Sequence, residues 1–426
     1  MSKIEVTPGM FSQAELKPSL KASISMAVIG LIVLLGFGVF GKTGDVRFVW
    51  SEKQELIKLP DWTVNSMTLC ISVGVILLLL AAVSLVWNRM NSVTPIWLTV
   101  VYGFFAIMAL LGWLATGAPQ GVQMVFILSN TIVLAIPLIL GGMAGIMSER
   151  VGVVNIAIEG QLLTGAFVSS VVGTITGNLY VGMIAAMVAA GLLSMVLASL
   201  AIKYLVEQII IGVLLNVLVI GITNFLHSAW VDKDRANLNF PGTFEKLPIP
   251  VLSDIPIIGQ ALFDNRITVY LMFLIVPILW YVLFRTKLGL RARSVGEHPL
   301  AADTVGINVA KTRFWWVTLG GMVAGLGGAA LTIGNVGSFG REMSGGQGFI
   351  ALAVVILGRW QPIYVTLGAL LFGFTIILRV WANQVSPGIP VDFITMVPYL
   401  VTLIAVAGFA GKVRPPAASG QPYVKG

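Results

Sequence analysis

The sequence predicts an all-α, polytopic membrane protein with about 10 to 12 transmembrane or re-entrant helices. Of its 426 residues, 57% are hydrophobic and 10% are charged, whereas soluble domains carry roughly 25% charged residues. The mean hydropathy is +0.94. Apolar stretches of about 20 residues, the length that a helix needs to cross a bilayer, recur along the chain. No interval between them could hold a separate core, so we expect a single membrane domain.

The predicted helices follow the apolar stretches in order. The stretches from Leu162 to Val172 and from Phe349 to Gly358 are nearer to half a membrane in length, which is typical of re-entrant or broken helices that line a pathway. The residues before the first stretch are polar and contain no apolar core, so we expect that stretch to act as the insertion signal. The predicted spans are residues 24–41, 66–87, 96–116, 124–146, 161–177, 179–202, 206–226, 267–284, 313–334, 346–358, 362–380 and 392–411.

The loop at residues 285–313 decides the predicted orientation, because Lys and Arg in short loops are retained in the cytoplasm. We therefore expect this loop in the cytoplasm, residues 227–266 outside, and both termini in the cytoplasm. The formal charge of +8 then reflects membrane orientation, since the basic residues lie at helix ends and form no groove for nucleic acid. The loop's basic residues are Arg285, Lys287, Arg291, Arg293, Lys311 and Arg313, and its acidic residues are Glu297 and Asp303.

One motif is typical of ATP binding but stands in the wrong context. The residues from Gly36 to Thr43 fit the phosphate-loop pattern, yet a working phosphate loop follows a buried strand and opens a helix. Here the glycines end an apolar helix, so we expect ATP and magnesium to be bound by a partner chain. The two histidines, His227 and His298, are predicted on opposite faces of the membrane, and no metal-ligand spacing is present. We expect no enzyme activity, no catalytic or metal-binding residue and no bound cofactor.

The segment between the fourth and fifth predicted helices places carboxylates at membrane depth. Glu159 follows Asn155 by four residues, so on a helix the two side chains would share a face. Charged groups at this depth are costly unless they are paired or face water, which favours a role in a translocation path for Asn155, Glu159 and Gln161. The alternative is structural, with Glu149 and Arg150 as an interfacial ion pair and Glu159 as the cap of the following helix.

Two glycine-interrupted polar segments, at 148–161 and 340–348, occupy comparable places in the two halves of the chain. Each leads into a short apolar helix. On the predicted topology the first opens toward the cytoplasm and the second toward the outside, as in an inverted-topology transporter repeat. Two unrelated loops are the alternative.

The predicted outer mouth contributes four further residues. Gln347 and Phe349, at the start of a short apolar stretch, are expected to contact a solute. Arg341 and Glu342 are expected to be structural, as caps of a helix.

A loop between Gly296 and Gly306 predicts a short helix. Proline is favoured at the first position of a helix, and small side chains follow Pro299. A helix with so little side-chain bulk can insert into a groove on another protein, whereas the plain alternative is an amphipathic surface loop. The residues of this candidate docking site are Gly296, Glu297, His298, Pro299, Leu300, Ala301, Ala302 and Asp303.

Three segments carry a resemblance to a known family: SERVGVVNIAIEG from Ser148, FRTKLGLRARSVGEHPLAAD from Phe284, and GQGFIALAVVILGRW from Gly346. With these segments the sequence resembles the permeases of bacterial ABC importers for simple sugars, nucleosides and branched-chain amino acids. It is most similar to the nucleoside, guanosine-type permeases, whose ending the tail from Arg414 to Tyr423 resembles. Residues 1–123 match less well.

The resemblance implies that the loop from Gly296 to Asp303 is a coupling helix, which docks into an ATP-binding subunit and transmits its closure. It also implies a second, related permease that forms a heterodimer with this chain, an extracytoplasmic substrate-binding lipoprotein and a location in the bacterial cell membrane. The corresponding division is a cytoplasmic segment at 1–23, N-terminal transmembrane helices at 24–123, a permease core at 124–411 with the coupling loop at 285–313, and a cytoplasmic tail at 412–426.

The expected function is that of a permease subunit, which imports nucleosides by alternating access while the partner hydrolyses ATP. A simple-sugar permease of the ribose type is one alternative. An ion-coupled secondary transporter is another; it would use Glu159 or Glu149 as a proton carrier and show a steep pH dependence. A membrane scaffold is a third, and it predicts that substitution of Asn155 leaves uptake unchanged.

Overall fold

The computed structural model describes residues 20–51, 58–90, 94–385, 396 and 414–424. The chain forms two compact units, each with its own helices and packing contacts. The first comprises Met1–Gln54, Lys58–Met124 and Ala382–Ile389, and the second comprises Glu55–Ile57, Val125–Trp381 and Pro390–Gly426.

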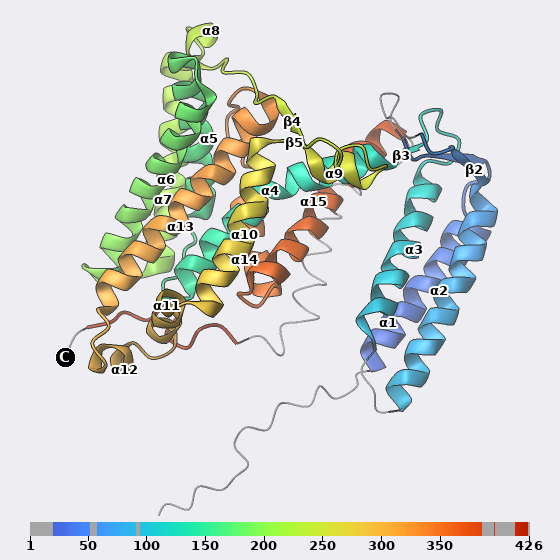
Figure 1. The fold of residues 1–426 in the computed structure, drawn as a ribbon, viewed down its shortest axis with the longest axis horizontal. Helices are drawn as coiled ribbons and strands as arrows, with labels where there is room; N and C mark the ends of the chain where they lie inside the picture. The colour runs from blue at the N-terminus through green and yellow to red at the C-terminus, as the bar shows by residue number, and fades with distance from the viewer. Residues whose placement is uncertain (1–19, 52–57, 91–93, 386–395, 397–413, 425–426) are drawn as a thin grey trace, which may run out of the picture. The chain divides into compact units, whose positions relative to one another are not determined.

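The first unit contains three long helices and a small sheet within its described residues (Figure 1, blue to cyan). Helix α1 (Leu20–Leu31) continues as a π-helical segment (Ile32–Val39), and is followed by α2 (Ser66–Arg89) and α3 (Ile96–Leu114). Strand β1 (Asp45–Val49) pairs antiparallel with β2 (Trp62–Asn65) and parallel with β3 (Val122–Gln123).

The helices of the first unit approach one another closely. A Cβ atom at Gly74 would lie 2.7 Å from Cα of Leu34, so glycine lets α2 approach the π-helical segment without lipid between them. The Asn88 amide donates to the hydroxyl of Ser23 at 2.7 Å across the same interface. The glycine-rich segment from Gly36 to Thr43 closes a helix and precedes a strand, which is the reverse of the order in a phosphate loop.

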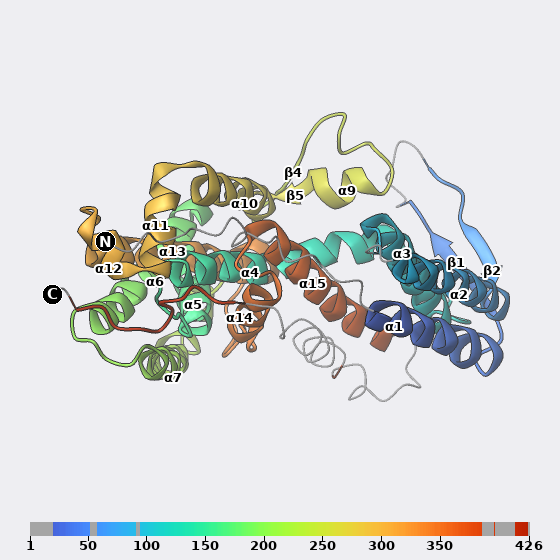
Figure 2. The ribbon, with the colours of Figure 1, turned by 90° about the horizontal axis from the view of Figure 1, so that it is seen from below.

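The second unit is a bundle of long helices with short elements at its ends (Figures 1 and 2). Its long helices are α4 (Met124–Glu149), α5 (Ile158–Thr176), α6 (Leu179–Ile202), α7 (Gln208–Leu226), α10 (Ile267–Arg285), α13 (Val309–Leu331) and α15 (Pro362–Val385). Its shorter elements are α8 (Arg235–Leu238), α9 (Ile258–Phe263), α11 (Lys287–Glu297), α12 (Pro299–Thr304) and α14 (Gln347–Leu357), with the antiparallel strands β4 (Lys246–Pro248) and β5 (Asp264–Arg266).

Helices α5, α6 and α13 form the tightly packed centre of this bundle, and they lie side by side in both ribbon views (Figures 1 and 2). Glycine makes this contact possible, because a Cβ atom at Gly165 on α5 would lie 2.3 Å from the carbonyl oxygen of Gly325 on α13. Backbones that approach this closely gain dispersion contacts along the whole helix face. A larger apolar core, which includes Ile136, Met143 and Leu326, fills the space around this centre.

Ten helices within the described residues are long and apolar enough to cross a membrane, which confirms the predicted all-α, polytopic fold. The short helix expected near 349–358 is present as α14, which has 11 residues. The expectation of a half-length helix from Leu162 to Val172 was wrong, because α5 runs for 19 residues from Ile158 to Thr176. Its first turn contains the polar residues Glu159 and Gln161, which lower the local hydropathy. A prediction based on hydropathy therefore made the helix too short. The span predicted at 392–411 lies almost wholly outside the described residues.

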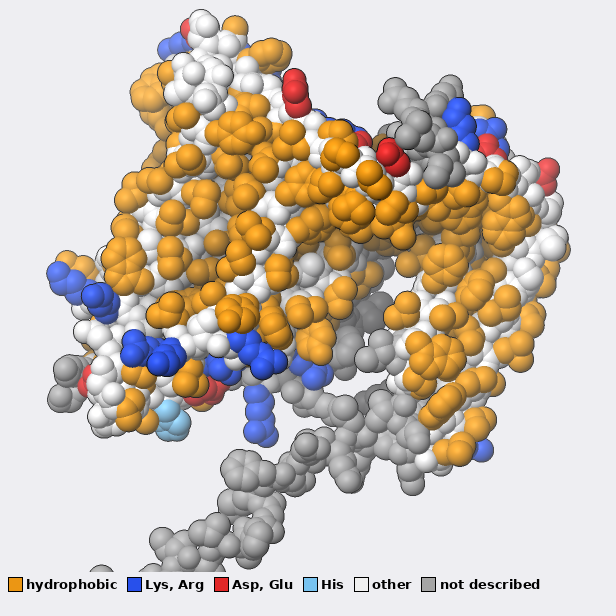
Figure 3. Space-filling model, viewed as in Figure 1, with side chains coloured by type: hydrophobic (Ala, Val, Ile, Leu, Met, Phe, Trp, Pro, Cys, Tyr) orange, Lys and Arg blue, Asp and Glu red, His pale blue; other side chains and the backbone are white. Residues whose placement is uncertain are grey.

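The surface of the second unit separates apolar from basic side chains (Figure 3). Hydrophobic side chains cover the sides of its helices, as lipid contact requires. On α7 the exposed residues include Ile210, Leu214 and Val217. Lys and Arg side chains gather instead at the end of the bundle where α11 and α12 lie (Figure 3).

Candidate functional site

The connection between α4 and α5 is a turn, and it separates two residues that were expected on one helix. Gly152 has φ +86°, a conformation that favours glycine and ends α4. Asn155 lies in the turn, whereas Glu159 lies in the first turn of α5, which begins at Ile158. The prediction that Asn155 and Glu159 share a helix face was therefore wrong, although both side chains are buried.

Asn155 pairs with Gln161 through a reciprocal amide contact. The Asn155 amide donates to Oε1 of Gln161 at 3.1 Å, and the Gln161 amide donates back to Oδ1 of Asn155 at 3.2 Å. The Gln161 amide also donates to the hydroxyl of Ser194 on α6 at 2.7 Å. Both side chains are fully buried, so this pair connects the turn, α5 and α6 by hydrogen bonds that water does not weaken.

Glu159 caps a helix distant in the sequence. Its carboxylate accepts hydrogen bonds from the Ser344 hydroxyl at 2.6 Å, from the Gly346 amide at 2.8 Å and from the Gly348 amide at 2.6 Å. These donors lie at the start of α14, where free amides and the helix dipole favour a negative charge. The expectation that Glu159 caps its own helix was wrong, because Asn216 on α7 accepts the Gly160 amide of α5 at 2.8 Å.

The beginnings of α5 and α14 therefore meet inside the bundle. A Cβ atom at position 348 would lie 2.3 Å from the Glu159 nitrogen, so only glycine permits this approach. The two polar segments that the sequence singled out, 148–161 and 340–348, are thus in direct contact. Nothing local in either segment indicates its partner.

Glu149 and Arg150 share a partner and do not pair with each other. Oε2 of Glu149 accepts the indole N–H of Trp360 in a short hydrogen bond. The Arg150 guanidinium donates from Nε and from a terminal nitrogen to the Trp360 carbonyl at 3.2 and 3.0 Å. Trp360 follows α14, and it has φ +54°. No ion pair between the two charged side chains is present in the described structure, so that prediction was wrong.

The candidate docking loop forms two helices, α11 and α12, at one end of the bundle (Figure 1). Pro299 is the first residue of α12, as expected, and Ala302 holds the helix to the bundle with its buried side chain. Leu300 and Ala301 are exposed, and Leu300 has 65% of its surface accessible. Gly296 and Glu297 are the last residues of α11, His298 alone joins the two helices, and Asp303 is half-buried in α12.

Gly296 ties this loop to the turn between α4 and α5. A Cβ atom at Gly296 would lie 2.2 Å from the Arg150 carbonyl oxygen and 3.4 Å from the Gly152 nitrogen. The docking loop thus rests directly on the turn that leads to Asn155 and Glu159. Only the folded structure reveals this contact, because the two segments are far apart in the chain.

The C-terminal segment crosses the same place. The Ala418 amide donates to the Gly296 carbonyl at 2.9 Å, and the Gly420 amide donates to the Gly152 carbonyl at 3.2 Å. The buried Arg313, at the start of α13, donates to the Gln421 carbonyl at 3.0 Å. The described tail therefore joins the docking loop, the turn and α13, although none of these tail residues was expected in the site.

Gln347 and Phe349 belong to the first turn of α14. The Gln347 Oε1 atom is buried, and it has no hydrogen-bond partner within the described structure, whereas Phe349 is 49% exposed. These residues lie beside the amides that Glu159 caps. Asn155 and Gln161 hydrogen-bond instead to each other and to α6, so the five predicted path residues divide into two adjoining groups around the first turn of α5.

Arg341 and Glu342 were expected to cap a helix. They instead contact residues at and just after the C-terminal end of α7. Arg341 pairs with Asp232 at 2.6 Å and donates to Nδ1 of His227 at 3.3 Å, and Glu342 accepts the Asn224 amide at 3.0 Å. Desolvation raises the pKa of Asp232, but the hydrogen bond and the charge of Arg341, together with His227, outweigh it and hold that pKa below its ordinary value. These contacts attach the segment before α14 to the end of α7.

The ten helices of the described residues that are long and apolar enough to cross a bilayer define a multi-pass membrane protein. Residues 127–406 match the family described as the permease component of branched-chain amino acid transport systems. The chain belongs to this family. It is a permease subunit of an ABC transporter, a transport component and not an enzyme.

Named relatives support the same assignment. The chain is 40% identical over 309 residues to the guanosine ABC transporter permease protein NupQ of Bacillus subtilis, which covers 70% of this chain and 97% of NupQ. It is 38% identical over 312 residues to the nucleoside ABC transporter permease protein NupC of Lactococcus lactis, covering 70% and 96% of the two chains. The putative glucose ABC transporter permease protein TsgC13 of Haloferax volcanii is 34% identical over 264 residues, covering 61% and 78% of the two chains. No solved structure matches the chain.

Membership of the ABC permease family implies work with an ATPase and a substrate-binding protein.

Sequence reasoning found the two segments that meet, but it missed Ser344, Asn216, Trp360 and Arg313, which hold them in place. Arg313 left a usable signal, because it and Lys311 are the two charged residues near the start of an otherwise apolar helix.

Proposed function

We propose that this chain is the membrane-spanning permease subunit of an ATP-driven nucleoside importer. The choice of solute is supported by NupQ and NupC, whose names specify guanosine and nucleoside transport and whose sequences align over 97% and 96% of their lengths. A simple-sugar importer is less favoured, because the putative glucose permease TsgC13 is 34% identical to the chain, below the 40% and 38% of NupQ and NupC.

One geometric observation supports the mechanism: the docking loop rests on the turn that leads to the path residues. Gly296 contacts Arg150, Asn155 pairs with Gln161 across the same turn, and Glu159 caps α14. Movement of α12 would therefore act on the starts of α5 and α14 through packed backbone. Such a contiguous set of contacts is what alternating access requires between a docking site and a path.

In this proposal, α12 lies in the cytoplasm and docks into an ATP-binding subunit, which holds ATP and magnesium. The resemblance to nucleoside permeases adds a second, related permease as heterodimer partner and a substrate-binding lipoprotein outside a bacterial cell membrane. The basic residues at the α11 and α12 end of the bundle (Figure 3) support this orientation, and we propose with it that both termini are cytoplasmic.

Reconstitution in proteoliposomes tests the proposal. The chain with its ATP-binding subunit, its partner permease and the binding lipoprotein should take up guanosine only when ATP is supplied. Excess ribose should not compete with guanosine. Uptake by the purified chain alone, at full rate and without ATP, would refute an ATP-driven importer.

The docking role of α12 has its own test. The double substitution Glu297→Arg with Ala301→Trp should abolish co-purification of the ATP-binding subunit, because it adds bulk and reverses a charge on the exposed loop. Lys203→Glu, a charge reversal after α6, is the matched control and should leave co-purification intact. Stoichiometric binding to the double variant would refute the docking site.

A proton-coupled transporter is less well supported by the geometry. The carboxylate of Glu159 accepts three hydrogen bonds from the start of α14, so protonation would place a hydrogen atom among donors. Glu149 likewise accepts the Trp360 indole. Both carboxylates are therefore structural acceptors in this arrangement. A steep dependence of uptake on the proton gradient, with ATP absent, would support the proton-coupled alternative.

A further inference from the structure

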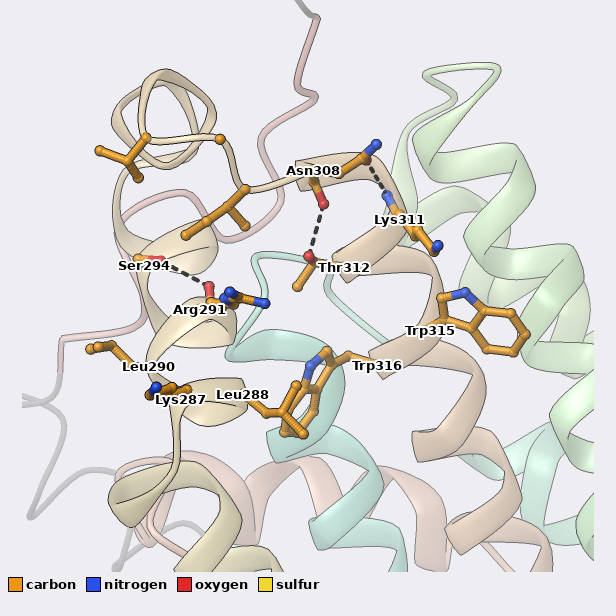
Figure 4. A pocket seen from close by; sticks show the side chains of 13 residues that line it. Lys287, Leu288, Leu290, Arg291, Ser294, Asn308, Lys311, Thr312, Trp315 and Trp316 are labelled. Atoms are coloured by element: carbon orange, nitrogen blue, oxygen red, sulfur yellow. Dashed lines mark hydrogen bonds between the residues drawn. The ribbon is translucent and has the colours of Figure 1, made fainter.

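A cavity of about 820 Å³ lies between α11 and the first turns of α13. Figure 4 shows Lys287 and Arg291 on α11 and Lys311 on α13 among the side chains that line it. The full lining comprises Lys287, Leu288, Leu290, Arg291, Ser294, Val305, Gly306, Ile307, Asn308, Lys311, Thr312, Trp315 and Trp316.

The charge of this cavity is unbalanced. Three of its lining side chains are cationic and none is acidic. Within the described structure, no ion pair involves Lys287, Arg291 or Lys311. The side chain of Asn308 caps α13 by accepting the Lys311 amide at 2.9 Å, so the positive end of the helix dipole also lies at the cavity. An anion would therefore be stabilised here by three separate charges and by the helix start.

The depth of the cavity indicates where the anion comes from. The span formed by α10 ends at Arg285, two residues before Lys287, and the span that includes Lys311 begins at Val309. Figure 1 shows α11 between the spanning helices and α12. The cationic groups therefore lie at the level where a bilayer's headgroups meet its hydrocarbon, which is also where Trp side chains concentrate.

The rim of the cavity is apolar and exposed. Leu288 and Leu290 on α11 are 61% and 60% exposed, and Trp315 on α13 is 48% exposed. A soluble anion would leave this apolar rim uncovered, whereas the acyl chains of a lipid would cover it. Basic pockets at the ends of transmembrane helices are suited to anionic headgroups for this reason.

We propose that this cavity is a binding site for one anionic phospholipid, whose phosphate lies among Lys287, Arg291 and Lys311 and whose acyl chains run along α13. The lipid fills the angle between α11 and α13, so it steadies the helix that leads into α12. This site is separate from the exposed side chains of α12, Leu300 and Ala301, which face away from the bundle.

Native mass spectrometry of the full-length chain tests the site. The protein is released from micelles that contain dioleoyl phosphatidylglycerol and dioleoyl phosphatidylcholine in equal amounts. We expect one phosphatidylglycerol to remain bound, with little phosphatidylcholine. Each of Arg291→Ala and Lys311→Ala should weaken retention about 5-fold, and the double variant about 30-fold, because each cation near a lipid headgroup contributes independently. Arg291→Lys keeps the charge and should retain the lipid.

Two controls keep the outcome decisive. Lys203→Gln removes one cation from the same end of the bundle, outside the cavity, and should leave retention unchanged. A monodisperse gel-filtration peak for each variant shows that it folds. Equal retention of the two lipids, or the same loss in Lys203→Gln, would overturn the proposal.

Two further arms separate other occupants from a lipid. Excess inorganic phosphate should not displace the bound phosphatidylglycerol, and displacement would identify the site as one for free anions. Saturating ATP-binding subunit should also leave the lipid in place. Release of the lipid by that subunit would show that this surface belongs to the protein partner and would overturn the proposal.

Discussion

Glu159 illustrates how one buried side chain joins distant parts of the chain. It lies in the first turn of α5, yet its carboxylate accepts hydrogen bonds from Ser344, Gly346 and Gly348 at the start of α14. Hydrogen bonds to an ionised acceptor are about twice as strong as neutral ones, and the buried site protects them from water. The side chain is therefore more important for the position of α14 than for that of its own helix.

Glu159→Gln should destabilise the protein by about 1–3 kcal/mol, because an amide nitrogen would replace one of the two acceptor oxygens and leave backbone donors unsatisfied. Thermal unfolding of the purified chain measures this change. Glu207→Gln is the matched control, since Glu207 caps α7 through two backbone amides at the exposed surface and should cost less. Equal effects of the two substitutions would contradict the buried-cap interpretation.

Gly348→Ala should also disturb the contact between α5 and α14. The added methyl group would lie 2.3 Å from the Glu159 nitrogen, and overpacking of this kind costs about 1–3 kcal/mol. Gly340→Ala provides the comparison, because its Cβ atom would meet only Met343 at 3.9 Å. The folded yield and the thermal midpoint should fall for the first variant alone. A normal midpoint for Gly348→Ala would show that α14 can shift without cost.

Among the elements, the tail at residues 414–424 crosses three segments and hydrogen-bonds to each of them. Its backbone bonds to Gly296, Gly152 and Arg313 join α12's loop, the turn after α4 and the start of α13. Arg313 is buried, and its Nε and one terminal nitrogen have no partner within the described residues, so its bond to Gln421 is a large part of what satisfies it. The tail thus contributes to the position of the docking loop.

Deletion of residues 414–426 should loosen the loop between α11 and α12. Four hydrogen bonds are lost, at about 0.5–1.5 kcal/mol each: those of the Gly296 and Gly152 carbonyls, that of Arg313, and that from the Ala417 amide to the Glu297 carboxylate. Hydrogen–deuterium exchange of residues 295–305 should become faster, while exchange in α6 stays unchanged. Ser419→Ala keeps the backbone bonds and should behave like the unaltered chain. Unchanged exchange after the deletion would show that the tail does not restrain the loop.

At the scale of the whole molecule, the two units differ in their relation to the family. The family match begins at residue 127, close to the start of the second unit at Val125. NupQ aligns over 97% of its own length while covering 70% of this chain. Most of the part of the chain that matches the family therefore lies in the second unit, which has its own apolar core.

A chain that begins at Met124 should consequently insert and fold. Circular dichroism and gel filtration of the purified fragment should show a helical, monodisperse protein, because the helices of the second unit bury their own core. The same fragment carrying Gly348→Ala serves as a misfolding reference. Aggregation of both fragments alike would show that the first unit is needed for folding.

Much of the fold was accessible from sequence because the bilayer imposes simple rules. Long apolar runs predicted the spans, and a proline between glycines predicted α12. The polar turn at 148–161 and the short helix α14 were both recognised as unusual. The length of α5 was misjudged, because a polar first turn lowers the hydropathy of a helix whose start is buried among other helices.

From the amino-acid sequence it could be predicted that this protein spans a membrane, where most of its helices lie, and which two polar segments interrupt them. These features follow from local composition, because every residue within a bilayer is surrounded by the same apolar solvent. Only the tertiary structure decided which partners those segments have. Glu159 caps α14, Glu149 binds Trp360, and Gly296 rests on Arg150. Such contacts join residues far apart in the chain, so packing geometry selects them and no local pattern encodes them.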